Sequence, residues 1–310
     1  PVEPAHIKLS HLAHLHLLHS RIRQATDDDQ GKKHVLELYL EQLPYALAAS
    51  ANALLVLLDA QHAAINSIRE RATGNPNSIR IYQLWEAEQH PIAFTIDSYL
   101  DSARRCQNGI WVYISKILRT SVPISLADIV ASLENGRLHL PDRIRNLLLE
   151  YWCTSGKRLK DYRDLAQHHA VASSDGRVTL VPDGRAFLYF LLPSNPEEKN
   201  PAKLLYDDPP VHALYYVIES FQALINFCNE LTHVLVSYTT TPKLERQTIM
   251  FKGPLKIGQE VHGHIVPGTN EVLSALLAQK DSLLTALDSE LPRDIEPTLV
   301  LPPDEPPPKS

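Results

Sequence analysis

The chain is poor in cysteine, which bears on both its chemistry and its compartment. Its 310 residues contain three cysteines, Cys106, Cys153 and Cys228, which are far apart in the sequence and form no CxxC pair. An odd, scattered set of this kind indicates neither a disulfide framework nor a zinc knuckle. We therefore expect a reducing, intracellular compartment and a hydrophobic core that folds without covalent cross-links.

Long apolar runs are also missing. The most apolar stretch, "YALAASANALLVLL" from Tyr45, is interrupted by Ser50 and Asn52. A membrane span needs about 20 apolar residues, so this stretch predicts a buried helix and not an anchor. The sequence begins at Pro1 without the basic-then-apolar pattern of a secretory signal. These features predict a cytoplasmic protein that does not engage a membrane.

Several common functional motifs are absent as well. The sequence has no Gly-rich phosphate loop, no nucleophile elbow and no HExxH motif, so ATPase, serine-hydrolase and zinc-protease functions lack support. No repeat at a fixed period is visible, which disfavours a solenoid. The formal net charge of -6 gives no overall attraction to nucleic acid, so any contact with RNA has to be local.

The dominant pattern in the sequence is helical periodicity. Apolar residues recur every three or four positions over residues 33–72, where Pro44 is expected to kink the helix or divide it into two. A second long helix is expected over residues 92–118, and a third, carrying an apolar stripe, within residues 207–238. This pattern predicts a mainly α fold.

Shorter helices are expected between the long ones, and each has a boundary signal. Ser125 with Asp128 three residues later resembles a capping box that opens a short helix. Pro141 is suited to the start of the next helix, and Gly156 is expected to end it.

The period changes to two after residue 170. The stretch "RVTLVPDGRAFLYFLL", residues 177–192, contains two β-favouring runs around Pro182-Asp183-Gly184, which predicts a hairpin. Residues 246–266 favour short strands, and a final helix is expected over residues 270–289. The last twenty residues hold seven prolines and cannot pack as a helix, so we expect an extended or disordered tail.

Taken together, the elements predict a multi-helix bundle with a small β-hairpin insertion, divided into four parts. These are an N-terminal helical region packing on the core (1–89), a helical core containing the hairpin (90–240), short strands with a C-terminal helix (241–290), and a Pro-rich disordered tail (291–310).

One segment, "GKRLKDYRDLAQHHA" (156–170), concentrates basic residues and histidines. From residue 143 to residue 164 the chain carries six basic and three acidic residues, a local net charge of +3 within a chain of net charge -6. On a helix, Arg163, Asp164 and His168 project from one side toward a common partner. Arginine presents a planar charged fork to phosphate, and histidine can exchange a proton at neutral pH. These groups are what phosphodiester cleavage without a metal requires.

The spacing of this segment resembles the signature of the HEPN superfamily, helical-bundle domains of prokaryotic defence and toxin systems. In that signature an Arg, usually followed by a polar residue, precedes a His by four to six intervening residues. Arg163 and His168 match with four, and Arg163 and His169 match with five. The flanking "YWCTSGKRLKDYRDLAQHH" and "RRCQNGIWVYISKIL" also resemble uncharacterised bacterial members, and the resemblance covers residues 90–238.

The resemblance implies a HEPN-type bundle that acts as a metal-independent endoribonuclease without a cofactor, built as a homodimer with both motifs facing a shared cleft. The 2′-hydroxyl of RNA would attack the adjacent phosphorus, with His168 as base or acid and Arg163 stabilising charge on phosphate oxygens. Asp164 would orient Arg163 or the imidazole, and His169 would replace His168 if the longer spacing operates. The residues expected to steer the RNA backbone are Lys157, Arg158 and Lys160. A toxin or phage-defence role, with an antitoxin or regulatory protein as partner, follows from the same resemblance.

Three alternatives accompany this interpretation. The bundle can be catalytically inactive and serve binding. The chain can also be an unrelated helical protein, in which Arg163 with Asp164 or Asp161 forms simple surface ion pairs of small energetic value. An interaction protein is the rival from another class, because the tail "PPDEPPPKS" can adopt polyproline II and dock in aromatic grooves.

Seven other histidines and the three tryptophans have structural interpretations. A leading amphipathic helix explains the N-terminal histidines better than a metal site does, because neither close pair has an acidic or cysteine partner. They are His6, His11, His14, His16 and His19. His262 and His264 are expected on one side of a strand, as surface residues. The tryptophans are interpreted as core residues because each lies in or beside an apolar stripe. They are Trp85, Trp111 and Trp152.

Overall fold

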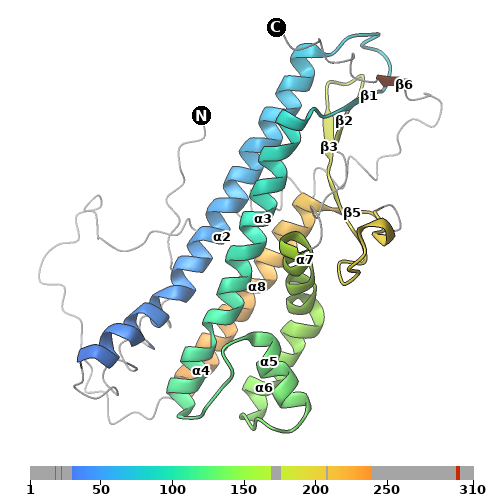
Figure 1. Cartoon of the computed structure of the whole chain (residues 1–310). Helices are drawn as coiled ribbons and strands as arrows, with labels where there is room; N and C mark the ends of the chain where they lie inside the picture. The colour runs from blue at the N-terminus through green and yellow to red at the C-terminus, as the bar shows by residue number, and fades with distance from the viewer. Residues whose placement is uncertain are drawn as a thin grey trace, which may run out of the picture.

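The computed structural model describes residues 30–168, 176–206, 209–238 and 298–300, together with Leu18 and Ile22. This part of the chain is mainly helical, as the periodicity predicts. Three long helices, α2 (Gln30–Arg71), α3 (Glu86–Gly109) and α8 (Ala213–Ser237), run side by side (Figure 1). A small sheet lies at one end of these helices and the shorter helices α4, α5 and α6 lie toward the other.

Helix α2 continues through Pro44, so of the two outcomes expected there, a kink or a division into two helices, the division does not occur. A proline inside a helix leaves the carbonyl four residues earlier without its usual N–H donor. Here that carbonyl belongs to Leu40, and it accepts a hydrogen bond of 2.8 Å from the hydroxyl of Tyr113. The donor comes from helix α4 (Trp111–Leu118), so a tertiary contact supplies what the local sequence removes.

The single helix expected over residues 92–118 forms as two helices, because α3 begins earlier, at Glu86, and ends at Gly109, and α4 follows from Trp111. The chain then forms α5 (Leu126–Glu134), where Ser125 Oγ accepts from the backbone N–H of Asp128 at 3.1 Å, as the capping box predicts. Helix α6 (Asp142–Tyr151) begins directly after Pro141, also as predicted.

Gly156 does not end the helix that begins after Pro141, which corrects the expectation from sequence. Helix α6 continues into a π-helical turn, η2 (Trp152–Gly156), and then into α7 (Lys157–His168). Gly156 is buried, and a Cβ placed there would lie 2.9 Å from Tyr151 Cε1. The glycine is therefore required by close packing inside a continuous helical path.

The hairpin predicted at Pro182-Asp183-Gly184 is present. Strand β2 (Arg177–Leu180) pairs antiparallel with β3 (Ala186–Tyr189), and Gly184 has the positive φ of 86° that the turn needs. Strand β1 (Arg80–Gln83) pairs with β2, and β6 (Thr298–Val300) adds parallel to β1, giving the order β3-β2-β1-β6. Strand β6 lies within the segment expected as a tail.

A second, two-stranded sheet connects the hairpin to α8. Strand β4 (Leu191–Leu192) pairs antiparallel with β5 (Val211–His212), with the short 3-10 helix η3 (Pro201–Lys203) between them in the sequence. Because β5 leads directly into α8, this pairing holds the start of α8 beside the end of the hairpin.

The core extends through the helical body and contains several fully buried tyrosines. Tyr99, Tyr113 and Tyr162 are at most 1% exposed. Each has a hydrogen-bond partner for its hydroxyl: Ser220 Oγ at 2.6 Å, the Leu40 carbonyl at 2.8 Å and the Pro193 carbonyl at 2.6 Å. A buried hydroxyl without a partner is costly, so these bonds help to specify which helices meet.

Several sequence predictions lie outside the described residues. These are the strands of residues 246–266, the helix of residues 270–289, the N-terminal histidines, His262, His264, and the tail apart from β6. Of the N-terminal region before α2, Leu18 and Ile22 are described, and both are buried in the core. By length and composition, Leu38–Arg71 meets the requirement for a membrane span, a test that long core helices of soluble proteins also pass.

Candidate functional site

Helix α7 carries the Arg–His motif, and its inner face holds it firmly against the body of the protein. Leu159, Tyr162 and Leu165 are at most 1% exposed. The ring of Tyr162 packs edge-on against Tyr216 of α8, with centroids 4.6 Å apart. This apolar contact determines which side of α7 remains for polar groups.

The π-helical turn before α7 also determines which side of α7 carries the polar groups. A π turn contains one residue more than an α turn, which rotates all later side chains by about 100° relative to the preceding helix. Gln107 of α3 braces this turn, because its Nε2 donates to the Tyr151 hydroxyl at 3.0 Å and to the Gly156 carbonyl at 3.1 Å. The orientation of α7 therefore depends on a buried polar contact with α3.

The polar face of α7 meets α3 at Arg163. The guanidinium Nη1 of Arg163 donates to Asp164 Oδ1 at 3.3 Å, and its Nη2 lies 3.8 Å from Asp101 Oδ1. Asp101 also forms an ion pair of 2.8 Å with Arg105 and accepts from Gln167 Nε2 at 3.3 Å. The Arg163 side chain is 27% exposed, and its Nε is buried without a hydrogen-bond partner among the described residues.

Asp164 links the charges along α7. Its Oδ2 lies 2.7 Å from Lys160 Nζ, which also contacts Asp161 at 3.4 Å. Burial would raise the pKa of Asp164, but hydrogen bonds and charge from Lys160 and Arg163 outweigh burial and lower it. The pKa of Lys160 is raised, because Asp164 and Asp161 outweigh the effect of its burial. Asp164 is therefore an anion at neutral pH.

A second arginine, Arg104, lies buried beside this cluster. It is 9% exposed, and its Nη1 donates to Gln107 Oε1 at 2.8 Å. Burial lowers the pKa of Arg104, the negative charge of Asp164 opposes that shift, and the positive charge of Arg163 adds to it. The two guanidinium groups thus act on each other while Asp164 partly neutralises both.

The structure describes the contact between Arg163 and Asp164, but the described residues do not include the whole motif. Helix α7 ends at His168. The side chain of His168, and all of His169, lie outside the described residues. The choice between the two histidine spacings accordingly stays a prediction.

The three residues expected to steer RNA have different surroundings. Lys157 is exposed at the start of α7. Arg158 lies over the rings of Tyr162 and Tyr216, at 5.6 and 5.8 Å, and donates to the Tyr162 hydroxyl at 3.2 Å. Lys160 is held by Asp164 and Asp161. The positive charge of this segment is therefore partly engaged within the chain.

Sequence reasoning missed the contribution of α3, although a signal was present. Asp97, Asp101, Arg104 and Asn108 recur at spacings of four, three and four within an amphipathic stretch. Such spacing places side chains on one face. Two of these residues, Asp101 and Arg104, take part in the charge cluster at α7.

Two of the smaller sequence interpretations change in the structure. Trp85 is 45% exposed, with the guanidinium of Arg71 3.7 Å from its ring centroid, so it is not a core residue; Trp111 and Trp152 do pack against the core. Cys106 and Cys228, which are distant in sequence, have Sγ atoms 3.8 Å apart in the core. Helices α3 and α8 bring them together.

Within the described residues, the cluster offers arginine and lysine charges and a carboxylate that orients them. These groups are suited to binding an anionic oxygen group. Within the described residues, no group of three His, Cys, Asp or Glu side chains is placed to hold a metal ion. Comparisons with protein-family models, with curated proteins and with solved structures find no match to this chain.

Proposed function

We propose that the chain is a HEPN-type, metal-independent endoribonuclease that cleaves RNA by attack of a 2′-hydroxyl on the adjacent phosphorus. The observation that carries the proposal is the placement of Arg163. Its guanidinium lies partly exposed at the α3–α7 interface, on the same helix as His168, with Asp164 in contact at 3.3 Å.

In this mechanism Arg163 binds the scissile phosphate and stabilises the charge that gathers on its oxygens. His168 takes the proton from the 2′-hydroxyl or gives one to the leaving 5′-oxygen, and a second copy in a homodimer supplies the other proton transfer. The products are a 2′,3′-cyclic phosphate and a free 5′-hydroxyl. His169 takes this role if the five-residue spacing operates.

Substrate binding requires Arg163 to exchange carboxylate partners for phosphate oxygens. The contact with Asp101 is long, at 3.8 Å, and Asp101 keeps Arg105 at 2.8 Å after the exchange. Partly exposed ion pairs contribute about 0–1 kcal/mol, whereas bidentate contacts to phosphate are among the stronger charge-assisted bonds. The exchange is therefore energetically accessible. Lys157, exposed beside the motif, is the cation suited to attract the RNA backbone.

An inactive helical binding protein is the second candidate, and the engagement of basic side chains favours it. Asp101 and Asp164 hold Arg163, Asp161 and Asp164 hold Lys160, and tyrosine rings pack against Arg158. If these contacts persist with RNA present, the bundle serves to bind a partner.

For the nuclease, the biological role that we propose is that of a toxin or phage-defence effector in the cytoplasm, controlled by an antitoxin or regulatory protein.

The experiment is incubation of the purified protein with total RNA in EDTA, with product ends analysed for 2′,3′-cyclic phosphate. We expect cleavage, loss of about 100-fold or more in His168→Ala, and no loss in Arg143→Ala. Arg143 is a matched control because it is an exposed arginine on α6. Cleavage that disappears in EDTA and returns with Mg²⁺ would reject this mechanism. No cleavage, with RNA still bound, would favour the binding protein.

The homodimer has its own test. Light scattering at micromolar concentration should give twice the mass of 34.8 kDa. A monomer under these conditions would count strongly against a cleft shared by two motifs.

A further inference from the structure

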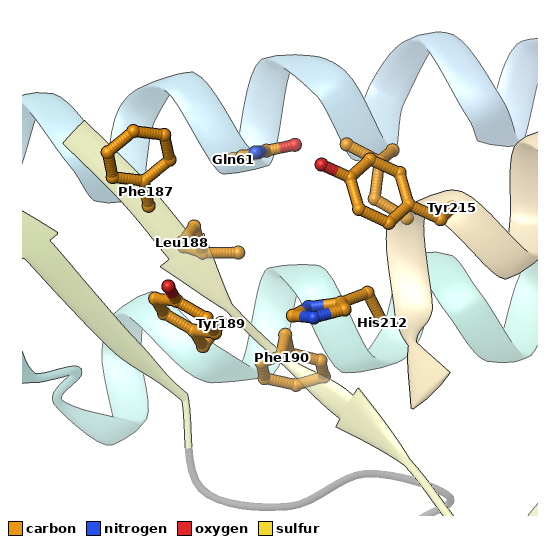
Figure 2. Close-up of a pocket in the computed structure, with 8 residues that line it drawn as sticks. Gln61, Phe187, Leu188, Tyr189, Phe190, His212 and Tyr215 are labelled. Carbon is orange, nitrogen blue, oxygen red and sulfur yellow. The ribbon is translucent and has the colours of Figure 1, made fainter. Parts of the chain in front are cut away.

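A small pocket, separate from the α3–α7 interface, lies between α2, β3 and the start of α8. It is enclosed mainly by aromatic rings, and Figure 2 shows these rings around one shared space. The side chains that line it include Gln61, Phe187, Tyr189, Phe190, His212 and Tyr215. The pairing of β4 with β5 brings the last two, which follow the hairpin by more than twenty residues, beside β3.

Three of the rings form a row with exposed surface. The centroids of Tyr189 and His212 are 5.5 Å apart, and those of His212 and Tyr215 are also 5.5 Å apart, at interplanar angles of 48° and 62°. All three residues are half-buried, so each is partly open to solvent. Exposed aromatic rings of this kind are surfaces on which another planar ring can stack.

The pocket also contains polar groups with unused capacity. The Gln61 amide, the Tyr189 and Tyr215 hydroxyls and the His212 ring form no hydrogen bonds to other described residues. Burial, with a smaller effect of the Arg177 charge, lowers the pKa of His212, and burial raises the pKa of Tyr215 to about 12. At neutral pH these groups are uncharged donors and acceptors, as a ligand edge requires.

One cation lies at the edge of this pocket. The guanidinium of Arg177, on β2, is 5.4 Å from the ring centroid of Tyr189. Arg177 is exposed and has no ion pair with any residue in the described ranges. It is therefore available to an anionic group attached to a ring that stacks beside Tyr189.

We propose that one nucleobase stacks on the row of rings at the open side of this pocket, and that Arg177 contacts the phosphate of the same nucleotide. Rings for stacking, uncharged groups for the base edge and a cation for the phosphate are the three features that nucleotide recognition combines. The choice of a nucleobase among planar rings rests on the proposed RNA substrate. The pocket interior is about 30 Å³, space for about one water molecule, so the base stacks on its open side and does not enter it.

The test is calorimetric titration of the full chain with two probes. One probe is AMP, and the other is an eight-nucleotide DNA strand, which lacks the 2′-hydroxyl and cannot be cut by the proposed chemistry. Binding of AMP alone identifies a free nucleotide as the source of the base, and tighter binding of the strand identifies a polynucleotide. If neither probe gives a heat of binding at millimolar concentration, the proposal is overturned.

Substitutions in the pocket test whether the probes bind there. Tyr215→Leu should weaken binding about 10-fold or more, whereas Tyr215→Phe, which keeps the ring, should change it less than about threefold. Arg177→Ala should weaken binding and reduce its salt dependence. The matched control is Tyr45→Leu, since Tyr45 is 70% exposed on α2 and is not among the residues that line the pocket. Binding that is unchanged in both Tyr215→Leu and Arg177→Ala would contradict the assignment.

Two further variants separate the possible failures. If circular dichroism shows that Tyr215→Leu does not fold, it is replaced by Gln61→Ala on helix α2. We expect Gln61→Ala to bind the probes more weakly, and unchanged binding would count against the pocket. Arg143→Ala, at an exposed arginine on α6, should bind both probes like the wild type. Probe binding without RNA cleavage would reject only the proposed nuclease activity, and RNA cleavage without probe binding at the pocket would reject only this inference.

Discussion

The two faces of helix α7 show how one short segment can combine rigidity with chemistry. The inner face consists of Leu159, Tyr162 and Leu165, which are buried, and its single hydroxyl is satisfied by the Pro193 carbonyl. The outer face carries Arg163 and Asp164, which are about one-third exposed and exchange contacts with α3. Apolar burial is worth kilocalories per side chain, whereas exposed ion pairs are worth little. Substitutions on the two faces should therefore differ in kind.

The largest expected effect is on the inner face. Tyr162→Ala should lower the free energy of unfolding by about 3–5 kcal/mol, because a fully buried aromatic ring is replaced by a cavity. Chemical denaturation of the purified variant measures this change. Tyr162→Phe keeps the ring and loses the hydroxyl's bonds to the Pro193 carbonyl and from Arg158, so it should lose about 1–2 kcal/mol. Equal losses in the two variants would show that packing of the ring is not what holds α7.

The next effect is on activity at the outer face. Arg163→Ala should reduce RNA cleavage about 100-fold or more, equivalent to about 2.7 kcal/mol, because charge on the phosphate loses its stabilisation. Its free energy of unfolding should change by less than about 1 kcal/mol, because Asp101 keeps Arg105 and Asp164 keeps Lys160. Cleavage assays and denaturation on the same preparation measure both. A loss of stability that matches the loss of activity would mean that Arg163 is structural.

An intermediate effect is expected at the π-helical turn, which orients the two faces of α7. Gly156→Ala places a Cβ 2.9 Å from Tyr151 and 3.2 Å from Trp152, so the π turn has to shift, with a loss of about 1–3 kcal/mol. Cleavage should fall as well, because α7 rotates relative to α3. Cys153→Ala, at an exposed position of the same turn, should change stability by less than about 0.5 kcal/mol. Full activity in Gly156→Ala would show that the orientation of α7 does not matter to the site.

The smallest effect is the pH dependence of the outer face. The pKa of Asp164 is lowered in the folded protein, so its contribution is present above the unfolded value of about 3.9 and is lost as pH falls through the lower folded value. Asp164→Asn should therefore be less stable than wild type at pH 7, by less than about 1 kcal/mol, and the difference should shrink as pH falls below the unfolded value. Asp59→Asn, on the exposed face of α2, is the control for removing one negative charge. A difference that does not shrink as pH falls would indicate a role other than charge.

The elements were predictable where the signal is local. Periodicity predicted α2, α3 and α8, Ser125 and Pro141 marked helix starts, and the Pro-Asp-Gly sequence marked the hairpin. Each signal acts over a few residues, because capping, turn geometry and amphipathic spacing are properties of neighbouring positions. The continuity of two helices was not predictable in this way. At Pro44 the missing donor is replaced by Tyr113, which is 73 residues away in the sequence. At Gly156 the helix continues because close packing of aromatic rings, not a turn, requires the glycine.

The sequence by itself determined the helical composition and the position of Arg163 and His168 on one amphipathic helix, because both follow from spacing along the chain. Only the tertiary structure decided that Asp101 and Arg104 of α3 join Arg163, and that His212 and Tyr215 meet Tyr189 at a pocket. These residues are separated by more than twenty positions, and no local propensity relates them. Their meeting depends on how buried faces pack, which is a property of the whole core.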